Sequence, residues 1–192
     1  MIRTLSLCLL LAAAAAPAAL ITQRADTDLQ SPALDGVISA NEYGPGNSYA
    51  YTGGGAGFGG QLGPSTLYMK SDVTNLYLGF SGLGAPSDGN RYIVYFHTRA
   101  AGFQPNGDMS DVSDGGRSNV SFLSSGGSES LTFEDGVSNK PDFALFFYNN
   151  ATGFSACVEL RGAGQAHVVV PRLHAALGTG SPEIRIPRAA LG

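Results

Sequence analysis

Short apolar segments separated by clusters of turn residues are the feature that most restricts the fold of this chain. Residues 67–70 and 76–81 flank the sequence Ser-Asp-Val-Thr-Asn, and the second segment alternates Leu76, Leu78 and Phe80 with other residues. Because a strand points alternate side chains to opposite faces, this alternation predicts a β-hairpin with one face in the core. Helical periodicity is almost absent along the chain, so we expect an all-β protein.

Continuous apolar runs at residues 91–97 and 143–148 predict central strands that are covered on both sides. Other segments have weaker strand patterns: residues 120–123, 130–133, 155–160, 167–170 and 183–186. Pro187 is expected to end the last strand, and residues 188–191 to form one short helical turn. Many short strands with glycine-rich turns predict an antiparallel β-sandwich of the jelly-roll kind.

The N-terminal region divides the chain into a predicted leader, a linker and one domain. Residues 1–19 combine Arg3, an apolar run and small residues after Pro17, which is typical of a cleaved signal peptide. The run is shorter than the ~20 residues needed to cross a bilayer, so we do not expect a membrane-spanning protein. Residues 20–33 resemble a linker, and residues 34–192 form the predicted domain. We expect Leu34 to Gly36 to supply its first strand and turn.

Charge and cysteine content narrow the class of protein further. The formal net charge is −4 and no basic cluster is present, which argues against binding to nucleic acid or to an anionic membrane surface. After removal of the leader only Cys157 remains, so an intramolecular disulfide is not available. We therefore expect Cys157 to be a small buried hydrophobic residue.

An acidic segment is the candidate metal site. Asp108, Asp111 and Asp114 recur at every third residue in a turn-rich stretch. Carboxylate oxygens are the ligands that calcium prefers, so three of them in a loop predict a Ca²⁺ site if they converge. The alternative is a solvated acidic loop, with Arg117 balancing part of its charge.

Aromatic residues near the start of the domain are the candidate ligand contacts. They lie in or beside a long glycine-rich connection, where an aromatic side chain is less easily explained by core packing: Tyr43, Tyr49, Tyr51 and Phe58. Aromatic faces stack on pyranose rings, so these side chains predict a carbohydrate site. The alternative is that they pack over an open end of the sandwich.

Catalytic motifs give little support for an enzyme. The chain has histidines and many serines, but no Gly-x-Ser-x-Gly elbow accompanies them. Carboxylates are present, yet the sequence cannot establish the separation that glycoside hydrolysis requires. His97 ends an apolar strand and is expected to be structural. We therefore assign no catalytic residue.

Several segments together resemble a known group of domains. These are Leu34-Asp35-Gly36 with Glu42-Tyr43-Gly44, the hairpin residues 67–78, Tyr92 to Arg99, Asp111 to Arg117, residues 131–145 and Ile184 to Gly192. In this order they are similar to secreted bacterial domains related to family-9 carbohydrate-binding modules and DOMON-like sandwiches, in particular to a poorly characterised exported subset.

The resemblance implies a β-sandwich of about ten strands outside the cell that in some members binds sugar or calcium. Family-9 sugar binders hold their ligand between tryptophans, and this chain has none. Haem-binding DOMON-like domains use methionine and histidine ligands, and no motif fixes such a pair here. Related domains often continue beyond the position of Gly192, so the chain is either a short member or a truncated one.

Three functional hypotheses follow. The first is a non-catalytic module, secreted or at the bacterial periplasm or cell surface, that binds a polysaccharide or cell-surface glycan. The second is a structural or adhesive envelope domain that calcium stabilises. The third is an exported hydrolase. The oligomeric state does not follow from the sequence.

Overall fold

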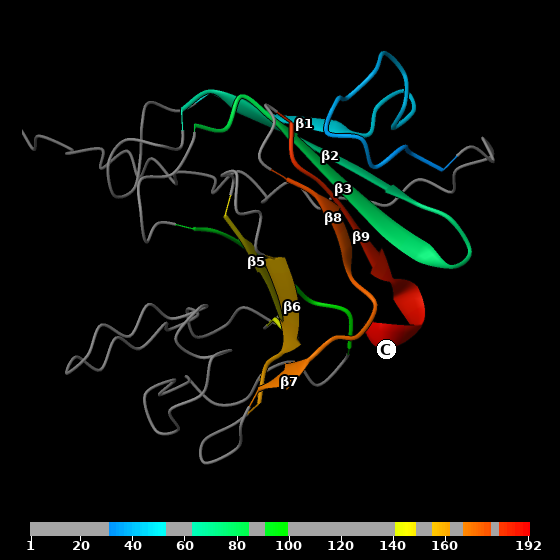
Figure 1. The fold of residues 1–192 in the computed structure, drawn as a ribbon, viewed down its shortest axis with the longest axis vertical. Helices are drawn as coiled ribbons and strands as arrows, with labels where there is room; N and C mark the ends of the chain where they lie inside the picture. Colours follow the sequence, from blue (N-terminus) through cyan, green and yellow to red (C-terminus); the bar gives the residue numbers. More distant parts are fainter. Residues whose placement is uncertain are drawn as a thin grey trace, which may run out of the picture.

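The strands of the protein pair into two antiparallel sheets that stack face to face, as the computed structural model shows (Figure 1). The structure describes residues 31–52, 63–84, 91–99, 141–148, 155–161, 167–177 and 181–192. Within these ranges nine strands and one short 3₁₀ helix are present. The predicted all-β antiparallel sandwich is therefore confirmed.

One sheet has five strands and the other has four. In spatial order the five-stranded sheet consists of β1 (Ser48–Tyr51), β2 (Ser65–Ser71), β3 (Asn75–Ser81), β9 (Glu183–Pro187) and β8 (His174–Ala176). The four-stranded sheet consists of β4 (Tyr92–Phe96), β5 (Phe143–Phe147), β6 (Ser155–Glu159) and β7 (Val168–Val169). The helix η2 (Arg188–Ala190) follows β9 directly, as the sequence predicted.

The turn between β2 and β3 is held by one carboxylate. Asp72 Oδ1 accepts hydrogen bonds from the backbone N–H of Thr74 at 2.7 Å and of Asn75 at 2.6 Å. The hydroxyl of Thr74 also donates to Oδ1, and Tyr77 Oη donates to Oδ2 at 2.8 Å. An aspartate that satisfies backbone donors two and three residues later favours a tight reversal of the chain. The predicted hairpin is confirmed, with Met69 opposite Leu78.

The main core lies between the two sheets. Leu78 and Ile184 from the five-stranded sheet, and Phe143 and Leu145 from the four-stranded sheet, are completely excluded from solvent. Burying one such side chain stabilises the fold by about 1.5–3 kcal/mol. Cys157 belongs to the same cluster, so its predicted role as a small buried residue is confirmed.

Strand β5 is fully buried on both faces, whereas β4 is half-buried. Phe143, Leu145 and Phe147 face the main core, while Ala144 and Phe146 form a second buried cluster on the opposite face with Val158 and Leu160. The prediction of a central strand is thus confirmed for β5. It holds only in part for β4: both of its faces pack against a cluster, but within the described residues it pairs only with β5 and its side chains are half-buried. Its continuous apolar run arises because alternate residues of β4 pack against the two different clusters.

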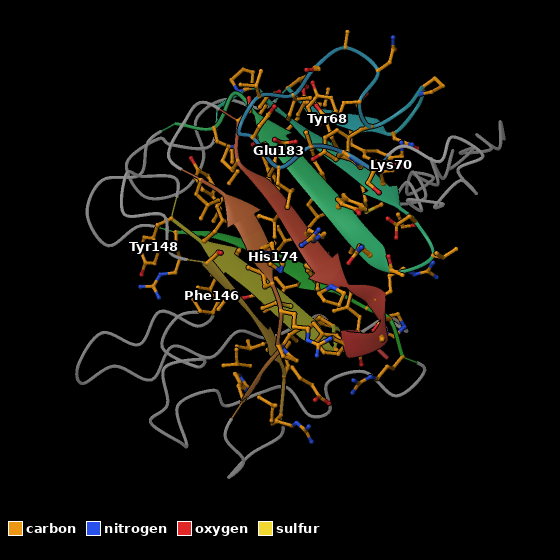
Figure 2. The ribbon with its side chains drawn as sticks, turned by 45° about the vertical axis from the view of Figure 1, so that its right-hand side comes forward. Tyr68, Lys70, Phe146, Tyr148, His174 and Glu183 are labelled. Carbon is orange, nitrogen blue, oxygen red and sulfur yellow. The ribbon has the colours of Figure 1, made fainter. Side chains whose placement is uncertain are left out.

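The outer face of the five-stranded sheet is covered by residues 31–47. The ring of Tyr43 lies over Gly79, where a Cβ atom would come within 2.7 Å of the Tyr43 hydroxyl oxygen. Figure 2 shows Glu183, Tyr68 and Lys70 in the part of this sheet near the N-terminal segment. The register confirms a shared face, since Tyr68 and Glu183 both lie opposite Gly79.

Glu183 is the residue that fixes this covering segment to the sheet. Its side chain is fully buried, and Oε2 accepts the backbone N–H groups of Asp35 at 3.1 Å and Gly36 at 2.9 Å. Oε1 accepts the hydroxyl of Tyr43 at 3.0 Å. The expectation that Leu34 to Gly36 form a first strand is therefore wrong: their backbone donors bind a side chain, and Gly36 has a left-handed φ of 81°.

Candidate functional site

Polar and charged side chains gather where three strands of the four-stranded sheet end. Phe96, the last residue of β4, lies opposite Phe143, which in turn lies opposite Glu159 at the end of β6. Residues that directly follow β4 or precede β5 therefore meet the end of β6. We call this set the charged cluster: His97, Arg99, Asp142, Glu159 and Arg161.

The buried carboxylate of Asp142 binds the backbone of residues that follow β4. The residue is 5% exposed, and its Oδ2 accepts the backbone N–H groups of Thr98 at 2.7 Å and Arg99 at 2.8 Å. The Nδ1 atom of His97 lies 3.4 Å from the same oxygen. A buried carboxylate needs such donors to offset the loss of water. Asp142 thereby fixes the backbone of Arg99, and with it the point from which the Arg99 side chain extends.

Two guanidinium groups share the carboxylate of Glu159. Nη1 of Arg99 lies 2.5 Å from Oε1, and Nη2 of Arg161 lies 2.6 Å from Oε2. Burial alone would raise the pKa of Glu159, but the two arginines outweigh it and hold the pKa below the usual range for glutamate. The group is therefore ionised at neutral pH, and the two arginines and Glu159 together carry a formal charge of one positive unit.

Arg99 is restrained on more than one side. Its Cζ atom lies 4.7 Å from the centroid of the Phe143 ring, within the range of a cation–π interaction. A Cβ atom on Gly192 would come within 2.6 Å of Arg99 Nε, so the chain at Gly192 passes close to this side chain. Next to it, the hydroxyl of Thr98 donates to the carbonyl of Leu191 at 2.6 Å. The C-terminal residues thus pack directly against the charged cluster.

Arg161 is positioned by a buried histidine. The Nδ1 atom of His167, which is 8% exposed, accepts the backbone N–H of Arg161 at 3.0 Å. An accepting Nδ1 requires that the proton of the neutral ring is on Nε2. The side chains of Arg99 and Arg161 are both 39% exposed, so the cluster is ordered by the fold and open to solvent.

Of the aromatic residues that the sequence singled out, Tyr43 is not brought together with Tyr49 and Tyr51. Tyr43 is 2% exposed and donates to Glu183, so its ring belongs to the layer that covers the five-stranded sheet. Tyr49 and Tyr51 lie on β1, opposite Leu67 and Ser65, on the same face of the sheet as the core. Tyr51 is 40% exposed and Tyr49 is half-buried. Tyr49 and Tyr51 remain predicted ligand contacts. Tyr43 is not assigned to a ligand site, because it is buried.

Phe58 and the predicted calcium ligands Asp108, Asp111 and Asp114 lie outside the described residues. Among the side chains that are described, no group of three or more His, Cys, Asp or Glu is placed to hold a metal ion. The calcium site therefore stays a prediction from the sequence.

Sequence reasoning did not single out Arg99, Glu159 and Arg161. Their only local signal is that each lies at or just after the end of an apolar strand, a position that many solvent-exposed charged residues occupy. What brings them together is the pairing of strands that lie far apart in sequence, and no pattern within one strand reports this register.

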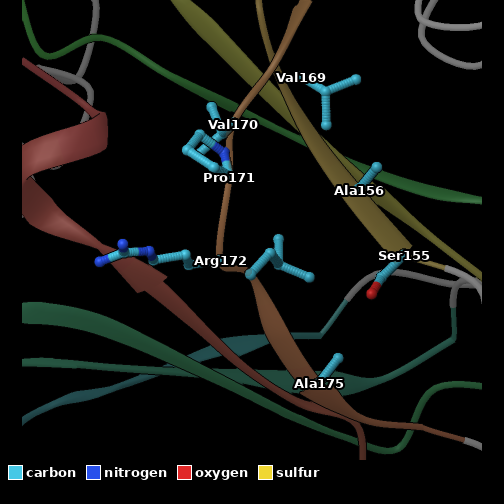
Figure 3. A pocket seen from close by; sticks show the side chains of 8 residues that line it. Ser155, Ala156, Val169, Val170, Pro171, Arg172 and Ala175 are labelled. Atoms are coloured by element: carbon cyan, nitrogen blue, oxygen red, sulfur yellow. The ribbon is translucent and has the colours of Figure 1, made fainter.

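A shallow groove lies beside β6 and the connection between β7 and β8 (Figure 3). Its volume is about 400 Å³, and most of its lining is apolar, including Ala156, Val169 and Leu173. Arg172 contributes to the wall with a left-handed φ of 62°, but its side chain points away from Ser155 and Ala156 (Figure 3). The groove lacks the converging polar groups that mark the charged cluster.

Comparisons with family models, curated proteins and solved structures give no match to this chain. In the described part of the chain, no helix is both long enough and apolar enough to span a membrane.

Proposed function

We propose that this protein is a non-catalytic binding module, exported by a bacterium, that holds a polysaccharide through the charged cluster. The export signal predicted at residues 1–19 and the resemblance to secreted sandwich domains support an extracellular or periplasmic location. The β-sandwich supplies a rigid base, and the ends of its strands supply the contacts.

The observation that carries the proposal is the restrained, exposed pair of arginines. Arg99 and Arg161 converge on Glu159, and Arg99 is held additionally by Phe143 and Gly192. Ordering a long side chain on binding costs about 0.5–1.5 kcal/mol, and here the fold already covers most of that cost. Guanidinium groups have donors in a fixed plane, which suits the oxygen-rich surface of a sugar chain.

The carboxylates of the cluster are poorly suited to catalysis. Glycoside hydrolysis requires one carboxyl group that stays protonated near neutral pH and can donate its proton. Glu159 is the reverse, since its pKa is lowered by Arg99 and Arg161. Asp142 is buried and accepts two backbone N–H groups, so it acts as a support for the chain. These features favour binding over hydrolysis.

A retention experiment with the full chain tests the proposal. The protein is incubated with a panel of insoluble or gel-embedded polysaccharides, and the bound fraction is compared between wild type and the double variant R99Q/R161Q. The matched control is R172Q, which removes one positive charge outside the cluster. We expect wild type and R172Q to be retained on at least one polysaccharide and the double variant to be released.

Two results would overturn the proposal. One is a lack of retention of the wild-type chain on every member of the panel. The other is equal retention of wild type and R99Q/R161Q, with both folded as judged by circular dichroism. Release of sugar from the same panel, measured as new reducing ends, would refute the non-catalytic part.

A further inference from the structure

We propose that the charged cluster selects acidic polysaccharides, and specifically sugar units that carry a ring carboxylate, over neutral chains of the same shape. This inference rests on the proposed function and names the ligand class of the same site. It starts from the exposed groups: two guanidiniums face the single partly exposed carboxylate of Glu159. The second carboxylate of the cluster, that of Asp142, is buried and accepts backbone N–H groups.

Both arginines of the cluster already bind one carboxylate, that of Glu159. Two nitrogens from different arginines approach the two oxygens of one planar group at 2.5 and 2.6 Å. Such short charge-assisted hydrogen bonds are stronger than bonds to a neutral hydroxyl. A guanidinium has five N–H donors, and the contact of Arg99 with Glu159 is made through Nη1. We assign Arg99 as the residue that contacts the ligand carboxylate and Arg161 as a support for the local charge.

The contacts that restrain Arg99 limit the directions from which a ligand can reach its guanidinium group, and this limit favours ligands of a particular geometry. The ring of Phe143 covers one region of the guanidinium, and the backbone at Gly192 lies against Nε. The group therefore presents a restricted set of directions to solvent, and its planar donors can pair with the two oxygens of a carboxylate. Because the whole chain has a net charge of −4, general attraction to polyanions is weak, and recognition must come from this short-range contact.

The test compares ligands that share one backbone. The full chain is run in affinity gels that contain polygalacturonate or its methyl ester, and dissociation constants are taken from the retardation. We expect binding to polygalacturonate to be roughly tenfold tighter or more than binding to the ester, which lacks the charge but keeps the sugar.

Variants assign the selectivity to Arg99. We expect R99K, which keeps the charge but loses the planar group, to reduce the preference for polygalacturonate over its ester, and R99Q to abolish it. The control R172Q is expected to keep the wild-type ratio. A preference that is unchanged in both Arg99 variants would overturn the assignment to Arg99.

The ligand comparison on the wild-type chain does not depend on the folding of any variant. Equal affinity for polygalacturonate and its ester would overturn the acidic selectivity while the proposed polysaccharide binding stands. Absence of binding to every polysaccharide, neutral ones included, would overturn the proposed function together with this inference.

Discussion

Replacement of Tyr43 by phenylalanine tests whether Glu183 fixes residues 31–47 to the five-stranded sheet. The ring keeps its packing against Tyr68, whose centroid lies 5.6 Å away, and only the hydroxyl is lost. Glu183 Oε1 then loses the donor at 3.0 Å, while Oε2 keeps the two backbone N–H groups. A hydrogen bond to a charged group contributes about 1.5–3 kcal/mol, and the buried position leaves no water to replace it.

The effect should depend on pH, with a sign set by Glu183. Burial raises the pKa of Glu183 above its ordinary value of 4.5, although the N–H of Gly36 and the hydroxyl of Tyr43 oppose the shift. Because its pKa is raised in the folded state, the contribution of Glu183 to stability is fully present below pH 4.5. It is lost as the pH rises through the raised pKa. Y43F removes a donor that favours the ionised form, so its pKa should rise further and the loss should be larger at high pH.

Urea denaturation followed by far-UV circular dichroism measures this loss. A cost of about 2 kcal/mol with a slope of about 2 kcal/mol per molar lowers the midpoint by roughly 1 M near neutral pH. The midpoint shift should be clearly smaller near pH 4, where Glu183 is protonated. Y49F is the control, because Tyr49 is a half-buried tyrosine on β1, away from Glu183. A loss no larger than in Y49F, or the same at both pH values, would refute the role of the Tyr43–Glu183 contact.

Other predictions concern the remaining close contacts. G79A should lower the unfolding midpoint by the equivalent of about 1–3 kcal/mol, because the added Cβ meets the Tyr43 hydroxyl oxygen at 2.7 Å; an unchanged midpoint would contradict the close packing. Burial alone would raise the pKa of Asp72, but hydrogen bonds from Thr74, Tyr77 and Asn75 lower it. The contribution of Asp72 to folding stability is therefore present above pH 3.8 and is lost as the pH falls below that value. D72N should therefore cost about 1 kcal/mol at neutral pH and approach wild type in acid, and parallel melting curves at every pH would speak against this. Burial raises the pKa of the Cys157 thiol to about 12, so a thiol reagent should label it only in denaturant, as mass spectrometry can check; rapid labelling of the folded chain would count against its burial.

Local patterns predicted the parts of the fold that depend on local physics. The alternation of Leu76, Leu78 and Phe80 identified the inner face of β3, because strand periodicity needs only neighbouring residues. Pro187 correctly marked the end of β9, since proline lacks the donor that a further ladder bond requires. The run at β5 gave a strand buried on both faces for the same local reason.

The sequence predictions failed for residues whose contacts come from segments far away in the sequence. Glu183 follows the polar positions of an alternating strand and would ordinarily face solvent, yet residues 31–47 cover it and supply its donors. Tyr43 was expected to contact a ligand because its neighbours in sequence do not reveal its real partner, the buried carboxylate of Glu183, 140 residues later. The charged cluster depends on the register of β4, β5 and β6, which arises from packing of whole strands.

Mapping of the binding surface by NMR tests the central claim most directly. Isotope-labelled full-length chain is titrated with a soluble oligogalacturonate, and backbone amide and arginine Nε–H shifts are followed. The largest changes are expected at Thr98, Arg99, Glu159 and Arg161, with little change at Tyr49 and Tyr51 on β1. Changes confined to β1, or no change at saturating ligand, would contradict binding at the charged cluster.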